Sequence, residues 1–323
     1  MSSLARAARE PHRRPDPAML AEVRAGLARP QKELSPKYFY DHRGSVLFEE
    51  ITRLPEYYLT RAERAILRAR VPGFVASLHP RSLVELGAGA AEKTRIILDA
   101  MMASGSGELY VPVDVSAEFL EETTGRLRRS YPSLHVEPWI ADIGTRFELP
   151  RAIPRPALFA LLGSTIGNFD AGAAGRLLRH ARQAMRPEDR FLLGADLLKD
   201  PAVLEAAYND AGGVTAEFNR NVLRVLNREL GADFDVDQFA HRAIFDADLR
   251  RIEMHLVSRV DQRVGIPGIG TIPFRKGETI RTEISCKYDR ASVEEMLAEA
   301  GMRLAEWWND DEQRFALAVG ARA

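Results

Sequence analysis

The sequence Ser-Leu-Val-Glu-Leu-Gly-Ala-Gly-Ala-Ala-Glu-Lys-Thr, at residues 82–94, decides the fold of this chain. Its opening apolar run predicts a short buried strand. Gly87 and Gly89 follow, and glycines let the backbone turn sharply and let a ligand approach with no Cβ in the way. The residues after the turn predict a helix. A strand, a glycine turn and a helix in this order indicate a nucleotide-binding unit, although a plain tight turn between strand and helix has the same pattern.

The position three residues after Gly89 narrows the choice of nucleotide. Dinucleotide folds carry a third glycine there, which admits a pyrophosphate at the helix N-terminus. This chain has Glu92 instead, and a carboxylate suits a cofactor without phosphates. An acid followed by Gly-x-Gly, here Glu85 to Gly89, resembles the first motif of the class I S-adenosylmethionine-dependent methyltransferases. That resemblance implies S-adenosylmethionine, which carries a sulfonium and an amino acid in place of phosphate, as the methyl donor.

Two later acids fit the same scheme. Residues 109–114 predict a second strand ending in Asp114, about 25 residues past the glycines and near the offset at which an acid meets ribose hydroxyls. Residues 139–143 predict a third strand end, with Asp142 where this superfamily holds the adenine amino group. Either acid alone could cap a helix or shape a turn. Three features in the expected order favour a methyltransferase.

Composition excludes several classes of protein. The chain has 323 residues, 46% of them hydrophobic, which is enough for a substantial core. Its 45 basic and 46 acidic residues give a net charge of −1, which argues against nucleic acid as a partner. A single cysteine, Cys286, excludes an internal disulfide and a cysteine-rich metal site, so we expect no metal.

The ends and the hydropathy of the chain bear on its compartment. Residues 1–17 are rich in arginine and proline, with no apolar run that could form the core of a signal peptide, so we expect a disordered tail. No apolar stretch approaches the ~20 residues needed to span a bilayer. One cysteine fits a reducing compartment. We therefore expect a cytoplasmic protein with no membrane contact.

The order of the remaining elements predicts two domains. Apolar runs at 157–162 and 191–196 extend a parallel sheet. Beyond Lys199 the pattern changes to helices at 203–208 and 214–229 and strands at 251–260 and 279–287. A glycine-rich turn at 265–270 separates the two strands, so we expect them to pair antiparallel. The alternation along the first strand predicts that Arg251, Glu253 and His255 point outward. A helix at 291–300 and strands at 304–308 and 315–319 return to the first sheet.

We therefore expect an α/β fold, a Rossmann-like class I methyltransferase sheet with an inserted α+β substrate-binding domain. Residues 61–199 and 288–323 would bind S-adenosylmethionine. Helices predicted at 17–29, at 45–53 and from about Thr60 would join residues 200–287, so that 18–60 and 200–287 form a lid. The loop at 163–168 ends in Asn168, whose amide suits an amino acid's ammonium and carboxylate, or simply shapes a turn.

Longer segments of the sequence resemble one particular family of methyltransferases. From about residue 20 to the C-terminus the chain resembles the L-histidine Nα-methyltransferases of ergothioneine biosynthesis, through the phrases at 39–41, 51–58, 84–87, 92–95, 163–168, 218–223 and 283–287. The resemblance implies three methyl transfers to the α-amino group of L-histidine, giving hercynine. It places the cofactor on Gly87, Lys93, Asp114, Asp142 and Ile143. It places histidine on Tyr57, Asn168, Tyr208, Met254, Glu283 and Ser285, with Ile284 between the last two, Gly163 beside the amine and Tyr40 near the ring.

The chemistry of these residues agrees with that implication. An imidazole has two ring nitrogens, so a pocket that recognises it needs a carboxylate to accept one N–H and a small hydroxyl at the other; Glu283 and Ser285 supply both from one strand face. Methyl transfer to nitrogen is a direct displacement that requires a neutral amine. We hypothesise that Tyr40 or Tyr57 helps the amine lose its proton.

Other interpretations stay open. Glu283 and Ser285 could form a solvent face of a strand, Tyr57 and Tyr208 core aromatics, and Met254 a gap-filler. The chain could methylate another amino acid such as tryptophan, although an indole has no second nitrogen for these groups, or it could be a non-catalytic protein that binds histidine or S-adenosylmethionine. We expect a monomer whose partners are L-histidine and its mono- and dimethyl forms.

Overall fold

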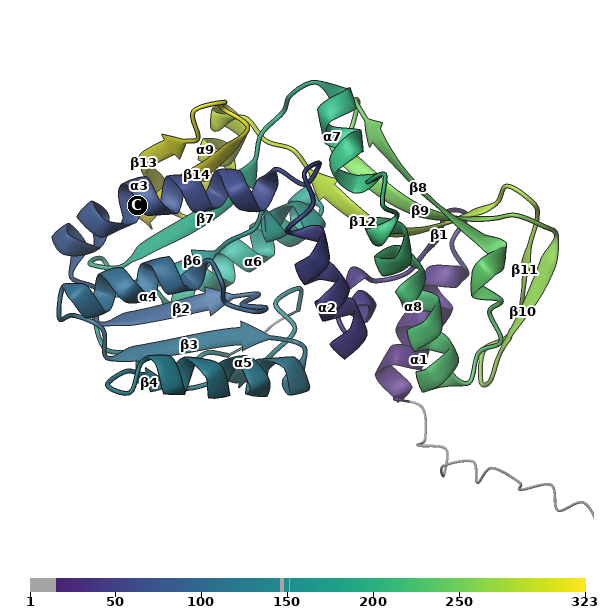
Figure 1. Ribbon diagram of the computed structural model, residues 1–323, viewed down its shortest axis with the longest axis horizontal. Helices are drawn as coiled ribbons and strands as arrows, with labels where there is room; N and C mark the ends of the chain where they lie inside the picture. The colour runs from purple at the N-terminus through teal and green to yellow at the C-terminus, as the bar shows by residue number, and fades with distance from the viewer. Residues whose placement is uncertain (1–15, 146–147, 151) are drawn as a thin grey trace, which may run out of the picture.

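The computed structural model describes residues 16–145, 148–150 and 152–323. The main sheet contains β2 (Ser82–Leu86), β3 (Leu109–Asp114), β4 (His135–Val136), β5 (Trp139–Ile140), β6 (Ala157–Leu161), β7 (Arg190–Asp196), β13 (Met302–Asn309) and β14 (Phe315–Arg322). Its order is β13-β14-β7-β6-β2-β3-β4, with β5 also paired to β3 (Figure 1). The central strands β7, β6, β2 and β3 are parallel, and β14 runs antiparallel between β7 and β13.

Helices cover both faces of this sheet, which explains why its central strands are buried and mostly apolar. One face is covered by α3 (Leu59–Leu78), α4 (Thr94–Ala103) and α5 (Ala117–Ser130), and the other by α6 (Ala171–Ala184) and α9 (Arg290–Glu299). Neighbouring residues alternate between the two cores: Leu83 packs with the first group of helices and Val84 with the second. The Rossmann-like class I methyltransferase sheet predicted from the sequence is confirmed.

A second, four-stranded sheet stands beside the first (Figure 1). Its order is β1-β12-β9-β8, formed by β1 (Lys32–Glu33), β8 (Phe239–Asp246), β9 (Arg251–Ser258) and β12 (Thr279–Cys286), with a separate hairpin of β10 (Gln262–Ile266) and β11 (Gly270–Phe274). The helices around it are α1 (Pro17–Leu27), α2 (His42–Ile51), α7 (Pro201–Tyr208), α8 (Val214–Leu230) and the short 3₁₀ helices η1 (Pro36–Phe39) and η3 (Val236–Gln238). N-terminal and inserted segments thus pack together: Asn221 of α8 donates a hydrogen bond to the carbonyl of Phe39, over 3.2 Å.

Some details of the second sheet differ from prediction. The predicted antiparallel pairing of β9 with β12 is confirmed, but the turn at 265–270 lies in the β10–β11 hairpin, and β8 was not predicted. Glu253 and His255 are buried, so their predicted outward position is wrong. The reason is an ion network on that face, in which Glu253 accepts hydrogen bonds from Arg251 at 3.0 Å and Arg281 at 2.8 Å and contacts His255 Nε2 at 2.9 Å.

Two element boundaries also differ. The helix predicted at 45–53 begins at His42, because the Asp41 carboxylate caps it by accepting the Gly44 N–H at 2.8 Å. The predicted strand end at 139–143 contains only the two residues of β5, so Asp142 lies in the turn that follows.

The predicted tail at 1–17 falls mostly outside the described residues, which begin at 16. Asp16 and Pro17 belong to α1 rather than to a tail: the Asp16 carboxylate accepts the Ala18 N–H at 2.9 Å, and Pro17 is the first helical residue. Within the described ranges, every helix is too short or too polar to cross a bilayer.

Candidate functional site

The glycine turn after β2 meets the end of β3. Gly87 and Gly89 have positive φ angles of 72° and 50°, a conformation that side chains with a Cβ adopt at a cost. The Gly89 N–H donates to Asp114 Oδ2 at 2.9 Å. A Cβ on Gly87 would lie 3.7 Å from Ile143, which shows that Ile143 packs over the turn. The structure therefore brings together Gly87, Asp114 and Ile143 of the predicted cofactor set.

Glu85 lies beneath this turn and anchors it. Its carboxylate accepts hydrogen bonds from Thr94 Oγ1 at 2.7 Å and from Tyr110 Oη at 2.5 Å. Burial raises the pKa of Glu85 to about 7, against the opposing effect of those two hydroxyl groups. The acid before the glycines thus ties β2 to the start of α4 and to β3.

Lys93 is held by a buried carboxylate that the sequence analysis missed. Its ammonium pairs with Glu63 of α3, a side chain with 0% exposure. The same carboxylate accepts the Gly163 N–H at 2.8 Å. Lys93 was predicted for the cofactor and Gly163 for the substrate, so one carboxylate joins both predicted groups. The helical periodicity of α3 identifies its buried face but not this partner.

Asp142 connects the main sheet to η1. Its carboxylate accepts the Gly144 N–H at 2.9 Å and a hydrogen bond from Lys37 Nζ at 3.1 Å. Lys37 also pairs with Glu22 of α1 at 2.7 Å. The predicted adenine-binding acid is therefore oriented by a residue from the N-terminal segment.

Most of the predicted substrate residues come from β9, β12, α7 and the 3₁₀ helix η2 (Thr165–Asn168), whereas Tyr40, Tyr57 and Gly163 lie in connecting segments. Glu283 lies opposite Met254 in the β12–β9 register, and Ser285 shares their face; a β-bulge between Arg281 and Glu283 sets this register. The Ser285 and Tyr208 hydroxyl oxygens are 2.8 Å apart. This confirms the prediction that Glu283 and Ser285 occupy one strand face.

Helix η2 packs directly on β12. A Cβ on Gly167 would lie 2.9 Å from the Cys286 carbonyl oxygen, a distance that only glycine permits. Asn168, Glu283 and Ile284 line one cavity of about 370 Å³, which is also bordered by α1, Arg251 and Arg281. The other predicted substrate residues do not line it: Tyr40, Tyr57, Gly163, Tyr208, Met254 and Ser285. The loop after β6 and the inserted strand therefore form one site.

Three buried phenols, Tyr40, Tyr57 and Tyr208, lie near enough to Glu283 for its charge to act on them. The Tyr57 and Tyr208 ring centroids are 6.2 Å apart, and Tyr40 packs edge-on against Phe218 at 5.6 Å. Burial, with a smaller contribution from the charge of Glu283, raises the pKa of all three tyrosines well above the ordinary value. They are neutral phenols that donate and accept hydrogen bonds.

Glu283 is the acidic residue among the predicted substrate residues, and Glu22, Glu33 and Asp170 also line the cavity. Only 9% of the surface of Glu283 is exposed to solvent. This burial raises the pKa of the Glu283 carboxyl to about 7, although the positive charge of Lys287 opposes the rise. Within the part of the chain that the structure describes, no N–H or O–H group donates to this carboxylate. It can therefore accept a hydrogen bond from a ligand.

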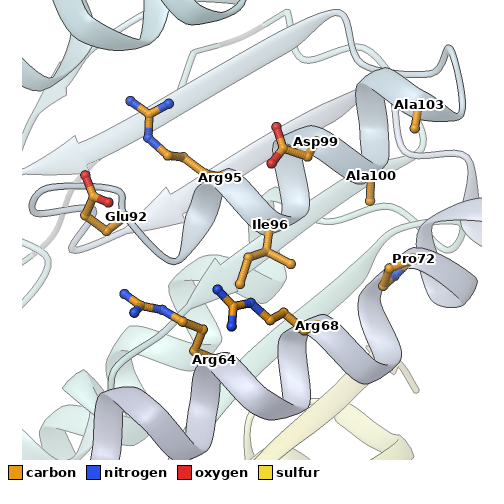
Figure 2. Close-up of a pocket in the computed structure, with 9 residues that line it drawn as sticks. All are labelled: Arg64, Arg68, Pro72, Glu92, Arg95, Ile96, Asp99, Ala100 and Ala103. Carbon is orange, nitrogen blue, oxygen red and sulfur yellow. The ribbon is translucent and has the colours of Figure 1, made fainter.

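A separate cavity of about 610 Å³ lies between α3 and α4. Figure 2 shows Ile96 of α4 pointing toward Arg64 and Arg68 of α3, whereas the Arg95 side chain extends away from them. None of the predicted cofactor or substrate residues lines this cavity. It is distinct from the site at the strand ends. In the described ranges, no three His, Cys, Asp or Glu side chains are arranged to hold a metal ion.

The residues at the strand ends fit S-adenosylmethionine. The left-handed glycines leave backbone open to a ligand beside Asp114, and nothing lies within 4 Å of a Cβ placed on Gly89. A carboxylate there suits ribose hydroxyls, and a second acid, Asp142, suits an amino group. The site lies beyond the carboxyl ends of parallel strands, where ligands bind in open α/β sheets.

Comparisons with known proteins agree with this geometry. A family model described as "Histidine-specific methyltransferase, SAM-dependent" matches residues 19–322. The chain is 46% identical to histidine N-alpha-methyltransferase of Mycobacterium tuberculosis (strain CDC 1551 / Oshkosh), over 94% of this chain and 95% of that protein. It is 30% identical to ergothioneine biosynthesis protein 1 of Neurospora crassa, over 90% of this chain and 33% of that protein.

A solved structure supports the fold. An S-adenosylmethionine-dependent methyltransferase from Clostridium acetobutylicum superposes with a TM-score of 0.50 at 12% identity, covering 85% of this chain and 98% of that one. The match of the family model over nearly the whole chain carries more weight. This chain belongs to the histidine-specific, S-adenosylmethionine-dependent methyltransferases.

Proposed function

We propose that this protein transfers methyl groups from S-adenosylmethionine to the α-amino group of L-histidine, giving the trimethylated product hercynine as the first step of ergothioneine biosynthesis. The observation that carries the proposal is the pairing of Glu283 and Ser285 on one face of β12, with Glu283 and Asn168 lining the same cavity. The names of the M. tuberculosis and N. crassa relatives support the same reaction and pathway.

On the cofactor side, the proposal assigns Gly87, Lys93, Asp114, Asp142 and Ile143 to S-adenosylmethionine. Asp114 would accept the ribose hydroxyls and Asp142 the adenine amino group, with Ile143 against the ring. The bound cofactor supplies a methyl group on a positively charged sulfur. The chain contributes the placement of that sulfur at the ends of the parallel strands, next to the loop after β6.

On the substrate side, Glu283 would accept one imidazole N–H and Ser285 would bond the other ring nitrogen. Tyr57, Tyr208 and Asn168 would hold the carboxylate and the amine of histidine. Met254 and Ile284 would flank the ring, and Gly163 would lie beside the amine. Recognition of the ring by these groups orients the amine, which is the main source of acceleration in a direct displacement.

The amine must lose its proton before each transfer. We assign this assistance to Tyr57 and Tyr40, as neutral phenols whose oxygen accepts an amine N–H and leaves the nitrogen lone pair directed at the methyl group in the first two transfers. The dimethylamine that attacks in the third transfer has no N–H, so there the phenols act before the attack, by accepting the N–H of the protonated form. Their buried position keeps them protonated, so water takes the released proton. The nitrogen forms its new bond to carbon as the carbon–sulfur bond breaks, with no covalent enzyme intermediate.

The proposed domain roles follow from the same assignment. Residues 61–199 and 288–323 hold the cofactor, and residues 18–60 and 200–287 form a lid over the substrate. Lys37 supports this arrangement, because its contacts with Asp142 and Glu22 link the N-terminal segment to the cofactor side. We also propose that the protein acts as a cytoplasmic monomer on histidine and its mono- and dimethyl forms.

The test is incubation of the purified protein with S-adenosylmethionine and each of the twenty amino acids in parallel, with mass gain measured in steps of one methyl group. Histidine alone should gain three methyl groups, and Glu283→Gln should lose that selectivity. Gain on another amino acid, such as tryptophan, would overturn the assignment of Glu283 and Ser285. Binding of histidine without any mass gain would identify a non-catalytic binding protein.

A further inference from the structure

Lys287 follows the two proposed imidazole-binding residues on β12 and contacts one of them. Its ammonium donates to Ser285 Oγ at 2.9 Å and to Tyr208 Oη at 3.1 Å, and it pairs with Asp196 Oδ2 at 2.8 Å. Its side chain has 0% exposure. An ammonium group has three N–H donors and no acceptor, so these contacts use every donor that Lys287 has.

Asp196, at the end of β7, fixes the position of Lys287. Its carboxylate also accepts hydrogen bonds from Tyr58 Oη at 2.8 Å and from Lys199 Nζ at 2.7 Å, and its side chain is fully buried. Two ammonium groups therefore share one carboxylate. The excess positive charge lies beside Glu283, whose carboxylate it helps to keep ionised.

The hydrogen count at the two hydroxyls determines what they offer to a ligand. Both oxygens accept from Lys287, so each has used one of its lone pairs. The two hydroxyl groups have two hydrogens between them. One bridges the 2.8 Å contact between Ser285 and Tyr208, and the other remains for a ligand. The pair therefore keeps one O–H donor for a ligand on the face of β12 that Ser285 shares with Glu283.

We propose that Lys287 is a specificity-determining positioning residue, which orients the Ser285–Tyr208 hydroxyl pair as a hydrogen-bond donor so that the pocket selects neutral imidazole in one tautomer. Glu283 accepts the ring N–H, and the Ser285 hydroxyl donates to the other, unprotonated ring nitrogen. In this arrangement Tyr208 donates to Ser285, and the Tyr208 oxygen can still accept from the amine of histidine. An indole or phenyl ring has no acceptor at that place and leaves the donor unpaired. This inference rests on the proposed histidine site.

The matched pair of variants is Lys287→Met and Lys199→Met. Each removes one ammonium from Asp196 and leaves the other ammonium and the Tyr58 hydroxyl in place, so the buried carboxylate keeps partners in both. Only Lys287 contacts Ser285 and Tyr208. Lys287→Met should raise the KM for histidine about 10- to 100-fold, as expected for a lost charge-assisted hydrogen bond. Lys199→Met should change it less than about threefold.

A pH profile separates this role from a structural one. The groups that act on Glu283 are Lys287, which directly follows β12, and the phenols of Tyr40, Tyr57 and Tyr208. Removal of the Lys287 charge should move the acidic limb of the kcat/KM profile to higher pH, because Glu283 then ionises less readily. Equal KM values and equal profiles in the two variants would overturn the proposal.

Wild-type protein gives a second measurement that does not depend on how the variants fold. Ring-labelled histidine is bound with S-adenosylhomocysteine at about pH 7.5, where a carboxylate neighbour could also hold the imidazolium form, and its nitrogen-15 spectrum is recorded. One protonated and one unprotonated ring nitrogen are expected. Two protonated nitrogens would overturn the proposal, since the hydroxyl pair would then be an acceptor.

Two further variants separate the proposal from the site on which it rests. Glu283→Gln and Ser285→Ala should each raise the KM for histidine. If neither does, the site assignment itself is wrong, and the role of Lys287 fails with it. If both do and Lys287→Met behaves like Lys199→Met, the site stands and only the positioning role is overturned.

Discussion

The Glu63 carboxylate accepts a hydrogen bond from the backbone N–H of Gly163, with 2.8 Å between oxygen and nitrogen. Glu63 lies on α3, and Gly163 begins the loop that follows β6. The same carboxylate pairs with Lys93, at the start of α4. One buried charge thus fixes both the loop proposed to face the amine of histidine and a residue proposed to contact the cofactor.

The first prediction concerns the stability that Glu63 provides. Glu63→Ala leaves the Lys93 ammonium and the Gly163 N–H without their partner, so it should lower the free energy of unfolding by about 3–5 kcal/mol. Glu63→Gln keeps an acceptor for Gly163 and should cost less. Urea denaturation followed by circular dichroism measures both. Glu108→Ala, which breaks the exposed pair with Arg81, is the control and should leave the midpoint unchanged. A wild-type midpoint for Glu63→Ala would contradict the prediction.

The second prediction isolates a close contact at Gly163. Its φ is 75°, and an added Cβ would lie 3.0 Å from Lys93 Nζ. Gly105 has a similar φ of 68°, but nothing lies within 4 Å of its Cβ position. Both alanine variants should lose about 1 kcal/mol to backbone strain. Gly163→Ala should in addition lower kcat/KM at least about tenfold, because Lys93 must move. Equal activity in the two variants would show that this contact has no functional effect.

The parts of the fold that could be predicted are those set by patterns of neighbouring residues in the sequence. The strand before Gly87 and the order of strands and helices follow from apolar runs and glycines, which act within a few residues. Glu63 and Lys287 were missed because they depend on partners far along the chain: Gly163 is 100 residues from Glu63, and Tyr208 is 79 residues from Lys287. A periodicity shows which face is buried but not which charged groups meet there.

The second sheet also contains contacts that local sequence patterns could not predict. Alternation along β9 placed Glu253 outward, yet Arg281 of β12 and Arg251 bind it and bury it. The bulge between Arg281 and Glu283 is equally invisible in the sequence, although it sets which residues share a face with Met254. The pairing of Glu283 with Ser285 was predictable because two residues separated by one position share a strand face.

The third prediction concerns how much the negative charge of Glu283 lowers the free energy of unfolding. The pKa of this carboxyl is about 7 in the folded protein against an ordinary value of 4.5. The folded state therefore holds the proton more tightly, and the charge destabilises the protein above pH 7 but not below about pH 4.5. Glu283→Gln should raise the free energy of unfolding at pH 8 by about 1–2 kcal/mol, since the buried amide offsets part of the gain.

Urea titrations of the ligand-free protein at pH 8 and pH 5 check this sign. The advantage of Glu283→Gln over wild type should shrink at pH 5, where the wild-type carboxyl is protonated. A constant difference at both values would mean that Glu283 does not titrate as described. The same variant should lose histidine turnover, which is the trade between stability and activity expected at a functional site.

The fourth prediction tests the tyrosines proposed to assist the amine. Tyr57→Phe removes a hydroxyl and keeps the ring that packs on Tyr208, so kcat should fall about 10- to 100-fold while histidine still binds. Tyr40→Phe should act in the same direction. Tyr131→Phe is the control, because its hydroxyl donates to Asp99 at 2.7 Å, on residues apart from the site, and its turnover should match wild type.

The shape of the pH profile then distinguishes a neutral phenol from a base. Burial raises the pKa of Tyr57 and Tyr40 well above the ordinary value, so neither group ionises in the range in which the enzyme is assayed. The profiles of Tyr57→Phe and wild type should run parallel between about pH 6 and pH 9, with the variant lower throughout. A limb that disappears in the variant would indicate a phenolate base instead. Wild-type turnover in both single phenylalanine variants would remove these tyrosines from the mechanism and leave proton loss to water alone.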